Sequence, residues 1–155
     1  MLLQQAILHD TKAVGARLMT HPQNYRVYGV LLRNRQVLIA AEYVGGLFVW
    51  KYPGGGVDHG ETAHAALRRE FREETGMEIR IVRELHDPGT LISPWTRAPY
   101  TPIYYLVESD DSPCVPAGEE IDMQFMEPDA VFASPLVAGP ERAALAAALE
   151  DHDGS

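Results

Sequence analysis

Residues 54–77, which read GGGVDHGETAHAALRREFREETGM, decide the fold of this chain. Three glycines, Gly54–Gly56, begin the stretch, and residues without a Cβ let the backbone turn tightly and approach a phosphate or an ion closely. A run of helix-forming residues follows, in which the Thr62 hydroxyl can cap the N-terminus and Gly76 can end the helix in the left-handed conformation. The stretch therefore predicts a glycine loop, a short amphipathic helix and a glycine stop.

Three glutamates of this helix share one face, because Glu70, Glu73 and Glu74 are spaced i, i+3 and i+4. Like charges at these spacings repel by about a few tenths of a kcal/mol per pair, so helix formation gives no reason for them. A divalent cation would make the grouping favourable, since carboxylate oxygens are the ligands that Mg²⁺ and Mn²⁺ prefer. Arg69, four residues before Glu73, can neutralise or orient it. An acidic face turned to solvent is the alternative explanation for this spacing.

With this spacing the stretch resembles the Nudix box, the motif of the Nudix hydrolase family. All seven fixed positions of the motif are occupied, by Gly55, Glu61, Arg69, Glu70, Glu73, Glu74 and Gly76. A chance match at seven positions in a chain of this length is on the order of one in a million. Phe71 stands where the family usually places a bulky aliphatic side chain, and the preceding Trp50–Gly54 also resembles the family. The resemblance implies an α/β fold, the Nudix fold, which is an α/β/α sandwich with a mixed central β-sheet.

The resemblance also implies which residues bind metal and which catalyse. Glu73 and Glu74 are the expected metal ligands, with the backbone carbonyl of Gly54 as a further ligand. Glu70 is expected either to ligate a second ion or to act as the general base, so that catalysis rests on these three glutamates. The family often supplies one more acid from outside the box, and here Glu120 is the leading candidate for it.

The remaining box residues have structural roles by the same resemblance. Gly55 allows close approach of the backbone, and Gly76 ends the helix. Glu61, at the start of the helix, is favoured there by the helix dipole. Arg69 is expected to orient a glutamate rather than to bind substrate.

Further candidate site residues occupy other positions inside and outside the motif. Glu119 and Asp122 are alternatives to Glu120, and a solvated acidic loop explains this cluster equally well. His59 and His64 lie in and beside the glycine loop and could touch substrate, although surface histidine is the simpler explanation. The aromatic residues that could stack on a nucleobase, or instead pack in the core, are Trp50, Tyr52, Trp95 and Tyr104.

The composition favours one globular domain over residues 1–155. The chain has 46% hydrophobic and 23% charged residues, a net charge of −9 and a pI near 5.0. This charge argues against a sequence-independent DNA binder or an anionic-membrane binder, which would need a basic face. Cys114 has no second cysteine to pair with and is expected to be a small loop residue in a reducing compartment. Without an apolar run of membrane-spanning length or a signal-peptide pattern, the expected location is the cytoplasm.

The rest of the chain alternates strand and turn signals around the box. Gln36 to Tyr43 is expected to form a hairpin with the strand before it, and residues 86–100, rich in Pro, Gly, Ser and Thr, are expected to be a long loop. Residues 1–20 are expected to form a helix or a strand followed by a turn, 129–137 a connector and 151–155 a frayed end. Strands are expected at 25–32, 36–43, 47–52, 78–85, 101–107 and 119–126, and a C-terminal helix at 140–149.

The resemblance implies a hydrolase dependent on Mg²⁺ or Mn²⁺ that cleaves the diphosphate linkage of a nucleoside diphosphate joined to another moiety. ADP-ribose or a sugar nucleotide is suggested as the substrate by Ser93-Pro94. This pair resembles the proline that marks ADP-ribose and related sugar-nucleotide pyrophosphatases, but it lies about two residues further from the box than in those enzymes. Nucleoside triphosphates, dinucleoside polyphosphates and capped RNA stay open as substrates. A non-catalytic nucleotide-binding module and the isomerase branch of the fold are further alternatives. The isomerase branch would need a catalytic cysteine, for which Cys114 is poorly placed. The expected partner is a small nucleotide-type substrate, with no DNA and no membrane, and a homodimer is left open.

Overall fold

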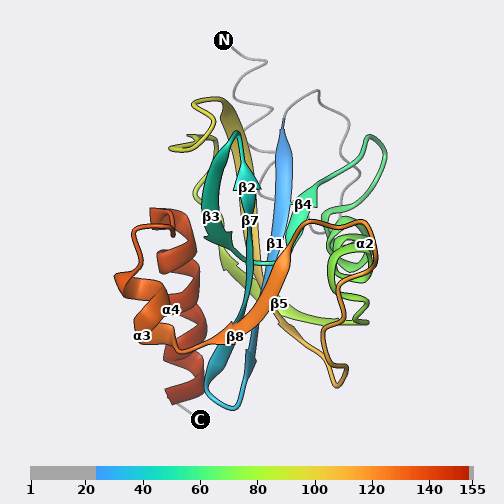
Figure 1. The fold of residues 1–155 in the computed structure, drawn as a ribbon, viewed down its shortest axis with the longest axis vertical. Helices are drawn as coiled ribbons and strands as arrows, with labels where there is room; N and C mark the ends of the chain where they lie inside the picture. The colour runs from blue at the N-terminus through green and yellow to red at the C-terminus, as the bar shows by residue number, and fades with distance from the viewer. Residues whose placement is uncertain (1–23, 154–155) are drawn as a thin grey trace.

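Eight strands form one mixed sheet at the centre of the structure (Figure 1). The computed structural model describes residues 24–153, so the expected helix or strand at 1–20 lies outside the described residues. The strands are β1 (Tyr25–Arg33), β2 (Gln36–Val44), β3 (Leu47–Lys51), β4 (Gly54–Gly56), β5 (Arg80–His86), β6 (Leu91–Ile92), β7 (Pro99–Glu108) and β8 (Asp122–Met126). The main path is β3-β2-β1-β7-β5, with β4 paired to β1, β6 to β7 and β8 to β2. β1 and β7 run parallel, whereas the other described pairings are antiparallel.

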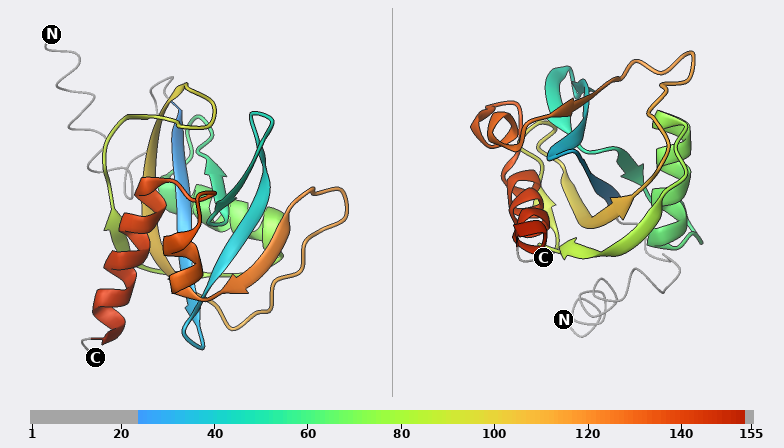
Figure 2. Two further views of the ribbon diagram at one scale, coloured as in Figure 1. Left: turned by 60° about the vertical axis from the view of Figure 1, so that its left-hand side comes forward. Right: turned by 90° about the horizontal axis from the view of Figure 1, so that it is seen from below.

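Helices cover both faces of this sheet. α2 (Ala63–Thr75) lies on one side, and α3 (Pro128–Ala133) and α4 (Gly139–Asp153) lie on the other, as Figure 1 and Figure 2 show. The prediction of an α/β fold with a mixed sheet between helices is confirmed. Within residues 24–153, no helix combines the length and the apolar character needed to cross a membrane.

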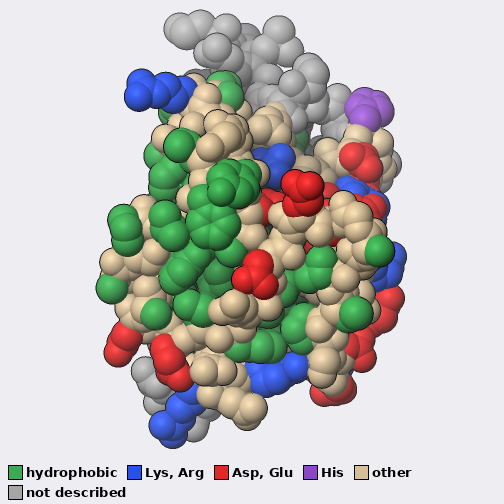
Figure 3. Space-filling view, viewed as in Figure 1, with side chains coloured by type: hydrophobic (Ala, Val, Ile, Leu, Met, Phe, Trp, Pro, Cys, Tyr) green, Lys and Arg blue, Asp and Glu red, His purple; other side chains and the backbone are tan. Residues whose placement is uncertain are grey.

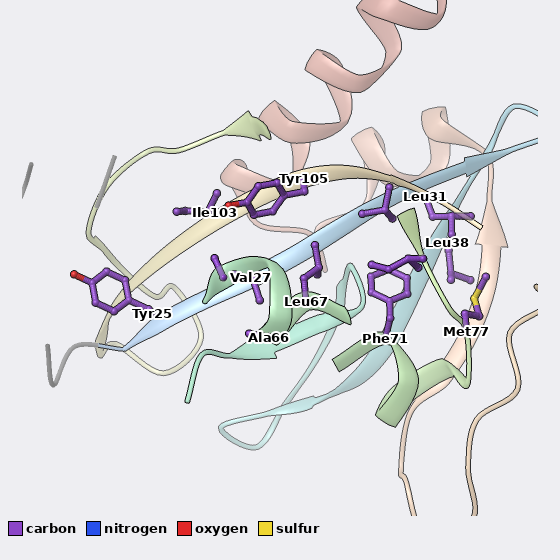
Figure 4. Packing of buried hydrophobic residues seen from close by; sticks show 13 residues of the cluster. Tyr25, Val27, Leu31, Leu38, Ala66, Leu67, Phe71, Met77, Ile103 and Tyr105 are labelled. Atoms are coloured by element: carbon purple, nitrogen blue, oxygen red, sulfur yellow. The ribbon is translucent and has the colours of Figure 1, made fainter. Parts of the chain in front are cut away.

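The two central strands send alternate side chains into two separate cores, because successive residues of a strand point to opposite faces. Val27 and Leu31 of β1 pack with Leu67 in the core beneath α2 (Figure 4). Tyr28 and Val30, at the intervening positions, pack in the core beneath α4. In β7 the same alternation sends Ile103, Tyr105 and Val107 to the α2 side and Tyr104 and Leu106 to the α4 side.

Phe71 fits under α2 because β1 has a glycine opposite its ring. The Phe71 side chain is fully buried, and a Cβ at Gly29 would lie 2.5 Å from its Cε2 atom. An aliphatic side chain at position 71, as the family usually has, would not fill this space in the same way. The aromatic residue and the glycine therefore form one packing unit.

Pairing of β1 with β2 confirms the expected hairpin between the strands at 25–32 and 36–43. Asn34 and Arg35 have φ angles of 51° and 64°, and the flanking residues Arg33 and Gln36 are paired. Two-residue hairpins favour turns with positive φ at both central positions, since these match the right-handed twist of the strands. Asparagine accepts this conformation readily, whereas arginine does not.

Residues 86–100 are more ordered than the expected long loop. β5 continues to His86, and β6 pairs with the first residues of β7, Leu91 with Tyr100 and Ile92 with Pro99. This pairing joins segments that are separated by a polar turn, so a reading of local composition misses it. The prediction of one continuous loop is therefore wrong.

Four further element boundaries differ from the sequence prediction. The glycines at 54–56 form β4 rather than a loop, because β1 offers them a partner strand. The expected connector at 129–137 contains most of α3, which has Pro128 at its first turn, where the fixed φ of proline is compatible with a helix. β8 begins at Asp122 rather than at residue 119. α4 continues to Asp153, beyond the expected start of fraying at residue 151.

Candidate active site

Both ends of α2 are held as the sequence predicts. The Thr62 Oγ1 atom accepts a hydrogen bond at 3.1 Å from a backbone N–H of the first turn. Gly76 has φ +70° and donates its N–H to the Arg72 carbonyl at 3.0 Å. Cys114, an exposed loop residue, donates its backbone N–H to the Thr75 carbonyl at 2.7 Å. The helix that carries the box is thereby fixed at its N-terminus and its C-terminus.

Arg69 joins most of the polar box residues through one guanidinium. Its Nε and Nη2 atoms donate to the two carboxylate oxygens of Glu61, at 2.8 and 2.9 Å. Nη1 donates to Glu70 at 3.1 Å and to Glu73 at 3.2 Å, and Nη2 also donates to the carbonyl of Gly56 at 2.9 Å. The hydrogen bonds from Arg69 lower the pKa of Glu61, and the hydrogen bonds to Glu61 raise the pKa of Arg69. The contact with both oxygens of Glu61 requires arginine, because the single ammonium group of lysine cannot donate two parallel hydrogen bonds to a carboxylate.

The glycines of β4 bring two box carboxylates against the backbone. The N–H of Gly54 donates to Glu74 Oε2 at 3.3 Å. A Cβ at Gly55 would lie 2.6 Å from the carboxyl carbon of Glu70, and a Cβ at Gly54, where φ is +151°, would lie 2.0 Å from the Val27 carbonyl oxygen. Neither position has room for a side chain, which is the physical reason for glycine there.

The carboxyls of Glu70 and Glu74 are costly to ionise where they lie. Burial raises the pKa of Glu74 to about 8, opposed by the nearby Lys51 ammonium and strengthened by the negative charge of Glu70. Burial also raises the pKa of Glu70, opposed by Arg69 and strengthened by Glu73. The side chain of Glu74 is 7% exposed. Two crowded acids of this kind would gain from a nearby positive charge.

Glu73 is more exposed than the other two acids. Its side chain is 52% exposed and pairs with Arg69, whereas Glu74 is buried beside β4. Within residues 24–153, no three His, Cys, Asp or Glu side chains are grouped closely enough to hold a metal ion. The three glutamates thus share a helix, but the structure does not bring their carboxylates to one point.

The candidates outside the box do not join it. Glu120 is exposed in the loop before β8, and no hydrogen bond or ion pair connects it to the box acids in the described part of the chain. Glu119 and Asp122 are exposed as well. His59 is exposed, and His64 is half-buried with its ring edge-on to Tyr105, 5.1 Å between centroids.

Charged residues on the strands, which the sequence analysis did not single out, lie beside the box acids instead. The Nζ atom of Lys51 lies 2.5 Å from Glu42 Oε1, and both residues interact electrostatically with Glu74. Arg26 interacts electrostatically with Glu70 and donates its Nε to the Tyr28 hydroxyl at 2.7 Å. Charged residues within otherwise apolar strands are the signal that could have identified them.

A cavity of about 160 Å³ adjoins these strand residues. Six of its lining residues are Arg26, Tyr28, Lys51, Trp95, Tyr100 and Glu141. The Arg26 Nη1 atom lies 3.8 Å from where a Cβ of Gly56 would be, so this side chain reaches from the cavity to β4. The cavity and the box acids are therefore neighbours.

Of the four aromatic candidates, Trp95 lines this cavity. Tyr52 and Tyr104 are fully buried in the core beneath α4, and the half-buried Trp50 packs against that core. Core packing, one of the two predicted roles, therefore applies to these three.

The β2–β3 hairpin carries exposed apolar side chains near its tip. Figure 3 shows apolar side chains gathered over this part of the surface, and Tyr43 and Phe48, with rings 5.3 Å apart, are 73% and 43% exposed. A Cβ at Gly45 in the hairpin turn would lie 3.3 Å from the Thr96 side chain, so this tip touches the turn that carries Trp95. Val44 beside the hairpin turn and Trp95 and Thr96 of the second turn all line the cavity.

The box residues fit a divalent cation by their chemistry. Glu70 and Glu74 offer hard oxygen donors at positions where burial disfavours their negative charge, and the absence of side chains at Gly54 and Gly55 lets both carboxyls lie directly against the backbone. A cation beside them would offset the burial cost of both carboxylates.

Comparisons with known proteins agree with this arrangement. The family model described as NUDIX domain matches residues 23–148. The chain is 44% identical over 59 residues to an RNA pyrophosphohydrolase from Serratia proteamaculans (strain 568), covering 37% of this chain and 33% of that protein. It is 38% identical over 87 residues to an RNA pyrophosphohydrolase from Shewanella baltica (strain OS155 / ATCC BAA-1091), covering 55% of this chain and 45% of that protein. The chain thus spans less than half the length of these curated relatives.

Solved structures show the same fold. A NUDIX hydrolase from Nitrosomonas europaea superposes with a TM-score of 0.68 at 18% sequence identity, covering 85% of this chain and 90% of that chain. The match of the family model extends over most of the chain, from β1 into α4. The resemblance carried by the box is confirmed, and the chain belongs to the Nudix domain family.

Proposed function

We propose that this chain is a hydrolase dependent on Mg²⁺ or Mn²⁺ that cleaves a phosphoanhydride in a nucleotide-type substrate. The observation that carries the proposal is the placement of Glu70 and Glu74 against the glycines of β4, where burial raises the pKa of both carboxyls. Helix stability does not require two buried acids, and a cation site accounts for both.

The residues that would hold the metal are Glu70, Glu73, Glu74 and the carbonyl of Gly54. When bound, the metal supplies charge screening for the phosphoryl oxygens and lowers the pKa of a water. Glu120 stays a prediction as a further ligand, and its exposed position does not add support.

The protein's own groups provide the positioning. Arg69 holds Glu70 and Glu73 in place through hydrogen bonds of 3.1 and 3.2 Å. Glu70, a carboxylate whose pKa is raised by burial, is suited to accept a proton from the attacking water at one of its carboxylate oxygens. Arg26, which reaches from the cavity to β4, supplies positive charge for the substrate phosphates.

For the substrate, we propose a nucleoside diphosphate joined to a second group, with the nucleoside directed to the cavity. The printed names of the Serratia and Shewanella relatives favour a second candidate, the 5′ phosphates of RNA. The Ser93-Pro94 pair gives little support for ADP-ribose, since Ser93 has a local role. Its Oγ accepts the backbone N–H groups of Trp95 and Thr96, both at 3.1 Å. A cytoplasmic location and a homodimer stay predictions.

A substrate panel assayed with Mg²⁺ and with Mn²⁺ tests the proposal. The panel contains ADP-ribose, UDP-sugars, nucleoside triphosphates, dinucleoside polyphosphates and 5′-triphosphorylated RNA, with products separated by chromatography. Glu73→Gln is expected to lower turnover at least about a hundredfold, because the variant would lose part of the several kcal/mol by which a bound metal stabilises the transition state. Glu78→Gln is the matched control, because Glu78 follows the same helix and pairs only at the surface with Arg72.

Two outcomes would count against the proposal. Equal turnover in Glu73→Gln and the parent would remove the metal assignment at this residue. Tight binding of a nucleotide without products from any substrate would favour the non-catalytic binding module.

A further inference from the structure

The cavity beside the box contains a buried acid that the hydrolysis does not use. Glu141, in the first turn of α4, is 7% exposed and lines the cavity. Its Oε1 atom accepts a hydrogen bond from the Tyr104 hydroxyl at 3.0 Å, and its backbone carbonyl accepts one from the Tyr52 hydroxyl at 2.6 Å. Both tyrosines are fully buried, so this carboxyl has a fixed position.

The second carboxyl oxygen of Glu141 lacks a partner. Among the described residues, its Oε2 atom makes no hydrogen bond although it is buried. Burial raises the pKa of Glu141 to about 7. A buried oxygen without a partner costs about 1–3 kcal/mol, and such groups in folded proteins are usually explained by a ligand, a water or a catalytic role.

Cationic and aromatic groups line the same cavity. The Lys51 ammonium lies close enough to Glu141 to oppose the rise of its pKa, and it also lies 5.6 Å from the centre of the Tyr28 ring. Trp95 and Tyr100 add further aromatic surface. The cavity thus offers an acceptor at one position, donors near it and rings on which a flat group can stack.

The size and place of the cavity limit what it can bind. About 160 Å³ is below the roughly 300–1,000 Å³ of pockets that enclose drug-sized ligands, so only one small ring system can enter. Arg26 connects the cavity to β4, so a group bound there would direct its attached phosphates toward Glu70 and Glu74. A flat heterocycle joined to phosphates is a nucleotide.

We propose that the cavity is a base-binding subsite for guanine, read by the Glu141 carboxylate; this inference rests on the proposed function of the neighbouring box. Among the common bases, guanine alone presents two adjacent N–H donors, the N1–H and the N2 amino group, which a carboxylate can accept together. Its O6 atom, next to them, accepts a hydrogen bond from a cation such as Lys51. Two charge-assisted hydrogen bonds compensate best for burying a carboxylate.

Calorimetric titration of the metal-free protein with GMP, IMP, AMP and UMP tests the subsite without requiring hydrolysis. GMP is expected to bind at least about tenfold more tightly than AMP and UMP, in line with a two-point contact to one base. IMP lacks only the N2 amino group and is expected to bind about five- to tenfold more weakly than GMP. In Glu141→Gln, whose amide cannot accept both donors, the difference between GMP and IMP should fall below about twofold.

The control variant is Glu150→Gln, since Glu150 lies exposed on the same helix. It should keep the preference of the parent for GMP, and circular dichroism should show Glu141→Gln folded. A preference of the parent for AMP or UMP would overturn guanine as the ligand. Equal binding of all four nucleotides would overturn the subsite. These results are independent of turnover, so a protein that prefers GMP and hydrolyses no substrate would refute only the proposed hydrolysis.

Discussion

At the scale of single residues, Arg69 determines how the box acids are arranged. One guanidinium contacts Glu61 through two oxygens, reaches Glu70 and Glu73, and also binds the carbonyl of Gly56. A residue that holds strand β4 and helix α2 together in this way does not need to touch substrate to affect catalysis. Its effect would act through the positions of the glutamates.

Arg69→Lys is expected to lower turnover at least about tenfold, because a single ammonium cannot bind Glu61 at two points and also reach Glu70 and Glu73. Steady-state kinetics on the best substrate of the panel measures this. The matched control is Arg72→Lys, since Arg72 is half-exposed and pairs with Glu78 at the surface. If both variants kept the activity of the parent, Arg69 would not be a positioning residue.

The buried carboxyl of Glu141 predicts that stability depends on pH. Its pKa is about 7 in the folded protein and about 4.5 in the unfolded chain, so folding favours the protonated form. The free energy of unfolding should therefore fall as the pH rises from about 4.5 through 7. In Glu141→Gln the loss of stability between pH 5 and pH 8 should be smaller by about 2 kcal/mol. Urea titrations at both pH values measure it, and an unchanged loss in the variant would contradict the buried charge as its source.

At the scale of elements, α2 rests on β1 through the pair of Phe71 and Gly29. The ring occupies the space that a side chain at position 29 would need. Alternation along β1 predicts which of its residues face α2, but it does not predict that one of them must be glycine. That requirement comes from the helix packed above the strand.

Gly29→Ala is expected to destabilise the protein by about 1–3 kcal/mol, because the new methyl group would lie 2.5 Å from the Phe71 ring. Combining it with Phe71→Leu should cost less than the sum of the two single changes, since the smaller side chain makes room for the methyl group. Denaturant unfolding of the parent, the two single variants and the double variant gives this coupling. Strict additivity would show that the two residues do not share one space.

At the scale of the whole molecule, the sheet brings together charges that are distant in sequence. Lys51 of β3, Glu42 of β2 and Glu74 of α2 form one electrostatic group, and Glu141 of α4 lines the adjoining cavity together with Lys51. A cation that binds here would bind the folded protein alone, because the unfolded chain does not assemble this site.

Mg²⁺ is therefore expected to raise the unfolding midpoint. At a metal concentration a hundred times the Kd the stabilisation is about 2.7 kcal/mol, which is roughly 5–10 °C for a domain of this size. Thermal unfolding followed with and without metal, in the parent and in Glu74→Gln, measures it. Glu150→Gln should retain the shift, and an equal shift in Glu74→Gln would exclude Glu74 as a ligand.

Local chemistry was enough to predict much of the structure. The caps Thr62 and Gly76 depend on backbone geometry within a few residues, and the central strands follow from alternation over short segments, so both could be read from the sequence. β6 and β4 were missed because their formation depends on partner strands elsewhere in the chain, β7 for β6 and β1 for β4.

The sequence by itself determined the family, the fold and the identities of the box residues, because seven fixed positions and two caps lie within one continuous stretch. Only the tertiary structure decided which charges surround them. It buried Glu74 beside Gly54, left Glu73 half-exposed and placed Lys51 near Glu74. The physical reason is that burial and Coulomb interactions depend on distances between elements, which spacing along the chain does not specify.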